Sequence, residues 1–274
     1  MHREFSDDDF QKFLVSPEAI ARTAEWEQTL SSMEKANMSA VGEGVLQWLP
    51  PEAVIRARVF PEIKPKTNSF VWSDAHGEHA IFLYLEKQTQ AQFENTVSHE
   101  CHHIGLSSLD EMQKKKFAGL PENVKTAIEW AGAFGEGEAM LAAAGSTERH
   151  PHWEDDDMAR ARWDSDMTHL NQDVSALTQF FNDILDGKLQ SDAIQEKAAP
   201  FFGRQGAFYT VGYEMAALVE KRFGRQVFLD CLLDPRQLLI RYNEIAAQAN
   251  KDGASLALWP EPMLRAMSPA NAPD

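Results

Sequence analysis

Cysteine is scarce in this sequence. Only two of the 274 residues are cysteines, Cys101 and Cys231. Two thiols are too few for the disulfide framework of a small secreted domain, and only their geometry can decide whether they form one bridge. We expect both thiols to be reduced and buried. A chain of this length buries roughly three-quarters of its unfolded surface, so its fold needs no covalent crosslink.

Long apolar runs are also missing. The N-terminal stretch "MHREFSDDDF" lacks the apolar core of a signal peptide, and no run approaches the roughly 20 apolar residues of a membrane span. We therefore expect no membrane span. As the sequence is written we expect a cytoplasmic protein, and an exported one if an N-terminal leader was trimmed.

Basic residues are fewer than acidic ones. The chain has 26 lysines and arginines against 42 aspartates and glutamates, which gives a formal net charge of −16, and "KKK" at 114–116 is its one basic cluster. Such a chain repels phosphate backbones, so we expect no nucleic-acid partner. The 43% of hydrophobic residues is typical of a globular protein.

The first fifty residues have helical character. Ser16 followed by Pro17 is a typical helix start, because the hydroxyl caps the helix and proline fits its first position. The run "EAIARTAEWEQTLSSMEKA" continues the pattern, and "LPP" at 49–51 ends it. We expect residues 1–50 to be helical.

Three runs of strand character follow: "AVIRARVF" at 53–60, "NSFVWS" at 68–73 and "HAIFLYLE" at 79–86. In the first run, Arg56 and Arg58 alternate with apolar residues, which predicts a sheet with one solvated face. The third run is apolar nearly throughout, so we expect it to be covered on both faces. His76 and His79 flank a glycine between two of the runs and are interpreted as turn residues.

Helical patterns dominate after residue 90. Phe93, Val97, Cys101 and Ile104 recur at helical spacing and predict one buried helical face, to which we assign Cys101 as a packing residue. Further helices are expected at 121–145, 156–186, 206–223, 225–233 and 236–249, with glycines 187 and 224 as stops, and the tail "SPANAPD" is expected to fray. The sequence thus predicts an α+β fold, with a small, antiparallel-rich sheet at 51–90 and a helical part at 91–250, in a single domain over 1–274.

Residues 99–103, "HECHH", form an HExxH motif on the helix expected after residue 90. His99 and His103 lie one turn apart, with about 5–6 Å between their Cβ atoms, so both imidazoles can reach one zinc ion at roughly 2.0–2.1 Å. Glu100 lies about 100° around the helix, beside the metal, where its carboxylate can take a proton from a water at the metal. We therefore predict a zinc site.

Two alternatives accompany this motif. His102 could bind the metal in place of His103, but only the pair four residues apart leaves Glu100 next to the water in the usual way. The stretch "HPHWEDDD" at 150–157 could form a second metal site. We favour a loop followed by the acidic start of a helix, where negative charge is stabilising.

A hydrolytic zinc site needs a third protein ligand and an open position for water. The stretch "FGEGEAM" at 134–140 offers Glu136 and Glu138, which are separated by about 200° around a helix. Only one of these two glutamates can face the metal.

The residues 136–139, Glu-Gly-Glu-Ala, resemble the segment that supplies the third, glutamate ligand in gluzincins of the aminopeptidase N and glycyl aminopeptidase type. This resemblance implies a zincin-like catalytic domain in which Glu136 is the third zinc ligand. Glu138 is then an acid that supports the ligands, an acid that faces the substrate, or a solvated side chain.

The segment "FYTVGYEMAALVEKRFGRQVFLDCLLDP" at 208–235 resembles a second part of the same enzymes, where a tyrosine three residues before a glycine opens a helix and supports the transition state. The resemblance implies this role for Tyr209, which precedes Gly212. Tyr213 lies one turn later on the same helical face and is its rival if the helix begins later.

The pattern over residues 90–245 is also similar to an uncharacterised family of zinc-dependent peptidases, through "YTVGYEMA", "DPRQLL" and "RYNE". The chain departs from aminopeptidase N in its longer histidine-to-glutamate interval, in lacking a "Gly-x-Met-Glu-Asn" motif and in lacking large flanking domains, which leaves substrate class and cleavage mode open. The resemblance implies a zinc metallopeptidase acting on a peptide or protein substrate. The alternative is a catalytically silent zincin fold that binds a partner, and the presence of both Glu100 and Tyr209 favours the enzyme.

Overall fold

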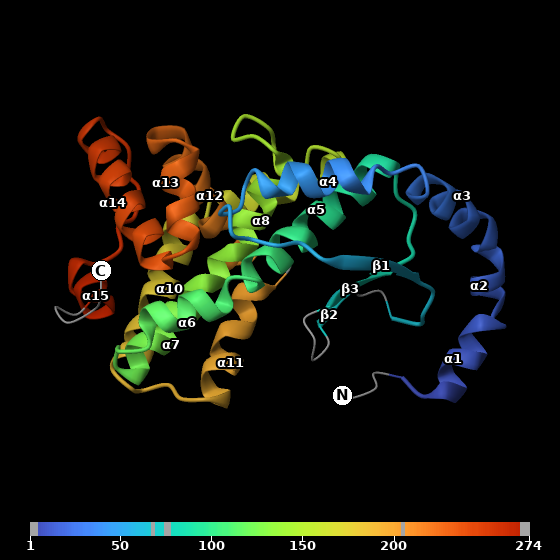
Figure 1. Ribbon diagram of the computed structural model, residues 1–274, viewed down its shortest axis with the longest axis horizontal. Coiled ribbons are helices and arrows are strands. Elements are labelled where there is room, and N and C mark those ends of the chain that lie inside the picture. Colours follow the sequence, from blue (N-terminus) through green and yellow to red (C-terminus); the bar gives the residue numbers. More distant parts are fainter. Residues whose placement is uncertain (1–4, 67–68, 74–77, 204–205, 269–274) are drawn as a thin grey trace.

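The computed structural model describes residues 5–66, 69–73, 78–203 and 206–268, and it is mostly helical with one small sheet (Figure 1). The α-helices are α1 (Asp7–Leu14), α2 (Pro17–Ala21), α3 (Thr23–Met33), α4 (Met38–Leu46), α5 (Gln90–Ser107), α6 (Asp110–Phe117), α7 (Glu122–Ala131), α8 (Gly135–Ala144), α9 (Asp157–Met167), α10 (Leu170–Leu185), α11 (Asp192–Ala198), α12 (Ala207–Phe223), α13 (Arg225–Leu232), α14 (Pro235–Lys251) and α15 (Glu261–Met267). Two short 3-10 helices, η1 (Gly132–Phe134) and η2 (Ala199–Phe202), complete the helical elements.

The sheet contains β1 (Ala57–Glu62), β2 (Phe70–Ser73) and β3 (His79–Tyr84) in the order β1-β3-β2. The predicted α+β class with a small sheet is confirmed. The sheet is mixed, however, because β3 pairs parallel with β1 and antiparallel with β2, where mostly antiparallel pairs were predicted. The most apolar strand, β3, takes the central position and separates β1 from β2, which run in opposite directions.

One face of β3 is buried and the other is only partly covered. Ile81 and Leu83 belong to the hydrophobic core. On the opposite face the ring of Phe82 stacks between those of Phe60 and Phe70, with centroid distances of 5.3 and 5.0 Å. Both outer rings are 41% exposed, so the prediction that this strand is covered on both faces was wrong for one face. Cross-strand aromatic pairs stabilise a sheet even where one side meets water.

The predicted element boundaries shift at several places. The first strand begins at Ala57, four residues late, because the preceding chain forms a turn in which the Ala53 amide donates to the Pro50 carbonyl at 2.9 Å. His79 opens β3 instead of lying in a turn, and its Nδ1 lies 2.8 Å from the Ser73 hydroxyl. The predicted helix at 121–145 is interrupted by η1, and that at 156–186 is divided into α9 and α10.

Some predictions fall outside the described residues. These are the strand start at Asn68, the turn residue His76 and the fraying of 269–274.

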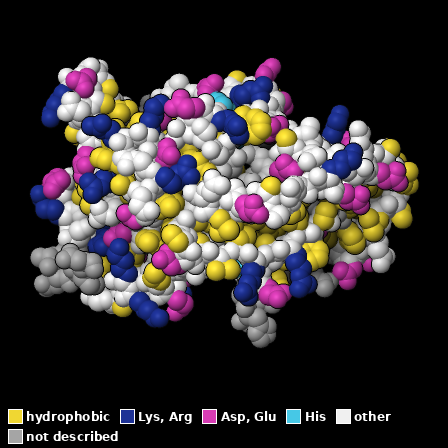
Figure 2. All heavy atoms as spheres, turned by 45° about the horizontal axis from the view of Figure 1, so that its top comes forward, with side chains coloured by type: hydrophobic (Ala, Val, Ile, Leu, Met, Phe, Trp, Pro, Cys, Tyr) yellow, Lys and Arg dark blue, Asp and Glu magenta, His cyan; other side chains and the backbone are white. Residues whose placement is uncertain are grey.

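The N-terminal helices α1, α2 and α3 curve away from the helical body, and no residue of α1 is buried (Figure 1). The Arg22 guanidinium fixes this arm to the sheet by donating to the Tyr84 hydroxyl at 2.7 Å. Hydrophobic side chains are exposed at this end of the molecule, including Val15 at 73% (Figure 2). None of the described helices combines the length and apolarity needed to cross a membrane.

Helices α8 and α12 cross with their backbones in direct contact at Gly137 and Gly212. A Cβ atom on Gly137 would lie 2.0 Å from the Tyr213 amide nitrogen and 2.4 Å from the Tyr209 carbonyl oxygen. A Cβ atom on Gly212 would lie 2.5 Å from the Phe134 carbonyl oxygen. Since only glycine lets two helix backbones approach so closely, these two residues set the spacing of α8 and α12.

We predict that Gly137→Ala lowers the free energy of unfolding by at least about 2 kcal/mol, because the added methyl group meets backbone atoms that can move only with the whole helix. Gly44→Ala is the matched control: it lies inside α4 with open space around its Cα, and alanine there should stabilise by about 0.5–1 kcal/mol. Urea denaturation measures both effects. A Gly137→Ala variant as stable as the parent would contradict the observed crossing.

Candidate metal centre

Helix α5 carries the HExxH motif on its partly exposed side. The helix begins with a capping box, in which the Thr89 hydroxyl accepts from the Gln92 amide and the Gln92 side chain accepts from the Thr89 amide. The predicted buried face is confirmed, since Phe93, Val97, Cys101 and Ile104 all belong to the hydrophobic core. Both cysteines are buried and free, as predicted.

His99, His103 and Glu136 bring three ligand atoms to one point. The two Nε2 atoms lie 3.0 Å apart, and the Glu136 Oε2 lies 3.3 Å from that of His99 and 3.2 Å from that of His103. Ligand atoms placed tetrahedrally at about 2.0–2.1 Å from a zinc ion are separated by about 3.3 Å, so this triangle has the size of one face of a zinc tetrahedron. Among the described residues, no other group of histidine, cysteine and acidic side chains converges in this way.

Glu136 and the two histidines interact through hydrogen bonds and opposite charge. Burial alone would raise the pKa of Glu136, but hydrogen bonds and charge from His103 and His99 outweigh it and hold this pKa far below its usual range. Burial alone would lower the pKa of His103, yet Glu136 raises it above its ordinary value. The carboxylate is therefore ionised, and positive charge beside it is favoured. Zinc supplies such charge, and two imidazoles with one carboxylate are a donor set that suits it.

Glu138 lies outside this triangle. Its side chain is only 5% exposed, and burial raises its pKa to about 8. The helix rotation between residues 136 and 138 therefore places Glu136 with the two histidines, and it places Glu138 in the interior. Its burial contradicts the alternative of a solvated side chain, and no local sequence pattern indicated it.

His102 also lies outside the triangle. It is fully buried, and burial holds its pKa well below the ordinary value, although a hydrogen bond with the backbone of Trp48 acts in the opposite direction. The imidazole is thus neutral and belongs to the buried side of α5. Its ring centroid is 6.4 Å from that of His103.

Tyr209 stands beside the three ligand residues. Its ring is nearly parallel to that of His99, with an interplanar angle of 9° and a centroid distance of 6.3 Å. Burial raises the pKa of Tyr209, and the negative charge of Glu136 raises it further, so its hydroxyl keeps its proton. The negative charge of Glu100 also raises the pKa values of Tyr209 and His103.

Tyr213 is directed elsewhere. Its hydroxyl donates to the Arg149 carbonyl at 3.3 Å, and its ring packs edge-on against Trp163 at 5.4 Å. It is buried in the core. Of the two tyrosines on this face of α12, Tyr209 is therefore the one that adjoins the histidines.

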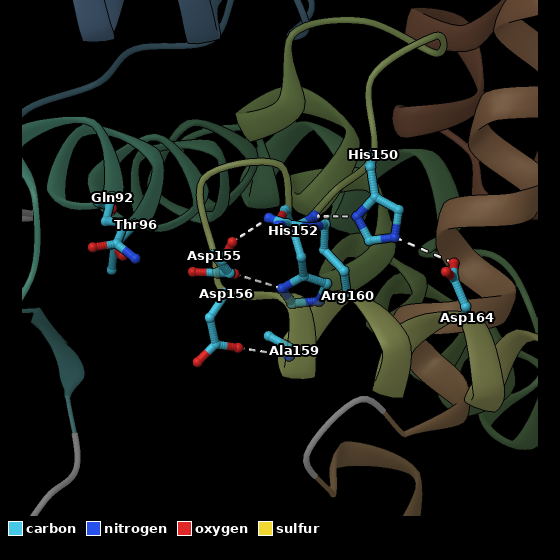
Figure 3. A network of polar contacts seen from close by, with 9 residues as sticks. All are labelled: Gln92, Thr96, His150, His152, Asp155, Asp156, Ala159, Arg160 and Asp164. Atoms are coloured by element: carbon cyan, nitrogen blue, oxygen red, sulfur yellow. Dashed lines mark hydrogen bonds and ion pairs between the residues drawn. The ribbon is translucent and has the colours of Figure 1, made fainter.

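The histidines of the 150–157 stretch contact polar groups of their own loop and of α9 (Figure 3). His150 accepts from the His152 amide at 3.0 Å and lies 3.3 Å from Asp164, and the His152 ring lies 2.7 Å from Asp155. Asp156 caps α9 by accepting from the Ala159 amide at 2.8 Å. In the part of the chain that the structure describes, this loop forms no second metal site.

Fold and centre together define a mostly helical α+β protein with a His-His-Glu site suited to zinc. The model of one protein family, described as "Putative zinc dependent peptidase (DUF5700)", matches residues 5–251. The chain belongs to this family. No curated protein and no solved structure matches it.

We predict about one zinc ion per chain in the parent and strongly reduced zinc in His99→Ala and Glu136→Ala, because each removes one of three ligands. Glu138→Ala should keep about one ion. Elemental analysis after dialysis measures the content. If Glu138→Ala loses the metal while Glu136→Ala keeps it, the ligand set described here is wrong.

In the metal-free protein, Glu138 should make stability fall as the pH rises from 4.5 to about 8. The folded protein holds a proton on this buried carboxyl that the unfolded chain has already released, so the unfolded state binds fewer protons in this window. A full one-proton difference corresponds to about 1.4 kcal/mol per pH unit. Urea denaturation with chelator should show a flatter pH profile for Glu138→Gln, and parallel profiles would contradict this prediction.

Proposed function

We propose that the protein is an HExxH zinc metallopeptidase of the gluzincin type that hydrolyses peptide bonds in a peptide or protein substrate. The observation that carries the proposal is the convergence of His99, His103 and Glu136 within 3.3 Å, on the two helices where the motif and the resemblance to aminopeptidase N predict them. The family match supports a zinc peptidase in general terms. The whole centre lies within residues 91–250, the part expected to be catalytic.

A zinc ion held by His99, His103 and Glu136 would supply a Lewis acid that polarises the substrate carbonyl and acidifies water. In this proposal Glu100 accepts the proton from the attacking water and later delivers it to the leaving amine. A carboxylate suits this transfer because it can hold the proton between the two steps.

Tyr209 donates a hydrogen bond to the carbonyl oxygen as negative charge develops on it. Its raised pKa supports this role, because a tyrosine that keeps its proton stays a donor at working pH. The near-parallel position of its ring beside that of His99, at a centroid distance of 6.3 Å, supports a donor next to the proposed zinc ligands.

We predict that Glu100→Gln binds about one zinc ion yet loses hydrolysis by a factor of at least about 10², because glutamine keeps the shape and loses the basicity. Glu94→Gln on the same helix is the control and should cleave as the parent does, since its carboxylate accepts hydrogen bonds from Asn37 and Gln90. A digest of a broad peptide library is the measurement. If Glu100→Gln hydrolyses peptides at a rate within a few-fold of that of the parent, the protein is not an HExxH zinc metallopeptidase of the proposed kind. A parent that binds zinc and cuts nothing would favour the catalytically silent alternative.

Tyr209→Phe removes only a hydroxyl, so zinc content and fold should survive while turnover falls by on the order of 10²–10³. The affinity for substrate should change much less, because the bond matters mainly in the transition state. Tyr213→Phe is the matched comparison and should stay close to the parent, since its hydroxyl serves the Arg149 carbonyl. Steady-state kinetics of both variants test this prediction. A large loss of turnover in Tyr213→Phe, with unchanged turnover in Tyr209→Phe, would assign the role of hydrogen-bond donor to Tyr213 instead.

A further inference from the structure

A cavity of about 680 Å³ adjoins the metal centre and has His103 and Glu136 in its wall. Helices α5, α6, α7 and α8 enclose it together with the junction between α13 and α14. Its volume falls in the range of about 300–1,000 Å³ that is typical of ligand sites. Since two of the three proposed zinc ligands form part of its wall, a substrate whose scissile bond lies at the metal would have a neighbouring side chain at the entrance of this cavity.

The wall of the cavity combines apolar side chains with one unusual carboxyl group. Leu106, Phe117 and Ile128 come from three different helices and supply apolar surface. Glu138 lines the same cavity, and no hydrogen bond or ion pair to its side chain is found among the described residues. A buried carboxyl group without a partner costs free energy that a ligand with a matching donor recovers.

Acidic side chains outnumber lysines in the wall of the cavity. Lys114 and Lys125 belong to the wall, but each is paired with a glutamate of its own helix, Glu111 and Glu122 respectively, neither of which lines the cavity. The acidic side chains of the wall include Asp110 and Glu129 besides Glu138. A cation is therefore the ligand group that this cavity favours.

We propose that this cavity receives the side chain of the substrate residue beside the cleaved bond, and that Glu138 selects a cationic side chain, that of lysine or arginine. These side chains carry a charged end on an aliphatic stem, which matches an apolar wall with a buried carboxyl group. A lysine or arginine side chain that reaches Glu138 would donate hydrogen bonds to its carboxyl group and so supply the missing partner. This specificity rests on the proposed peptidase function.

The first arm of the test is cleavage. The zinc-loaded full chain digests a peptide library that samples all residues on both sides of each bond, and mass spectrometry identifies the product ends. We expect lysine and arginine to be enriched on one side by on the order of 10–100-fold, the range for a hydrogen bond to a charged group. Glu138→Gln should lose the enrichment. Glu214→Gln, which alters a largely buried carboxyl group on α12 outside the cavity, should keep it.

The second arm is binding and needs no turnover. Calorimetry measures acetyl-Ala-Ala-Lys-Ala-Ala-amide and its norleucine counterpart on the zinc-loaded Glu100→Gln variant, with and without Glu138→Gln. The lysine peptide should bind at least about tenfold more tightly, and only where Glu138 is present. Binding with this preference but no cleavage by the parent would retain the cavity's specificity and reject the proposed function.

Three results overturn the proposal. These are equal binding of the two peptides, a cationic preference that survives Glu138→Gln, and loss of zinc in Glu138→Gln, which would show that this carboxyl group serves the metal instead.

Discussion

The backbone contact between Gly137 and Gly212 is the constraint on which the centre depends. Glu136 immediately precedes one of these glycines, and Tyr209 lies one helical turn before the other, so the crossing of α8 and α12 fixes the glutamate relative to the tyrosine. Helix α8 also packs along α5, which carries the two histidines. Three helices far apart in sequence thus meet at one point, and the smallest side chain at the crossing determines how closely they meet.

The centre is built to hold positive charge. Two imidazoles and a carboxylate lie within 3.3 Å of one another in a partly buried place, and the pKa of Glu136 stays low because its neighbours favour the ionised form. Without a metal, a proton on His103 is favoured, because Glu136 raises the pKa of this imidazole. A zinc ion would supply a divalent charge instead, so we expect metal binding to stabilise the fold and to release protons.

The sequence predicted the helix of the motif, the α+β class and the stretches that contain the candidate residues. It did so because a buried stripe and an HExxH spacing are local patterns. Helical periodicity alone left Glu136 and Glu138 equal, and the choice came from a resemblance, because helix rotation relative to α5 is a tertiary property. The rival tyrosines, the central position of β3 and the cavity beside Glu138 likewise depend on which elements pack together, and no local pattern records that.

A zinc ion held by His99, His103 and Glu136 would lie between α5 and α8. Anomalous diffraction at the zinc edge, from crystals of the zinc-loaded protein, would locate this ion. The proposed position predicts a single peak about 2.0–2.2 Å from the Nε2 atoms of His99 and His103 and from a carboxylate oxygen of Glu136. A peak coordinated by Glu138 or His102, a peak at the loop of His150 and His152, or no peak on α5 would contradict it.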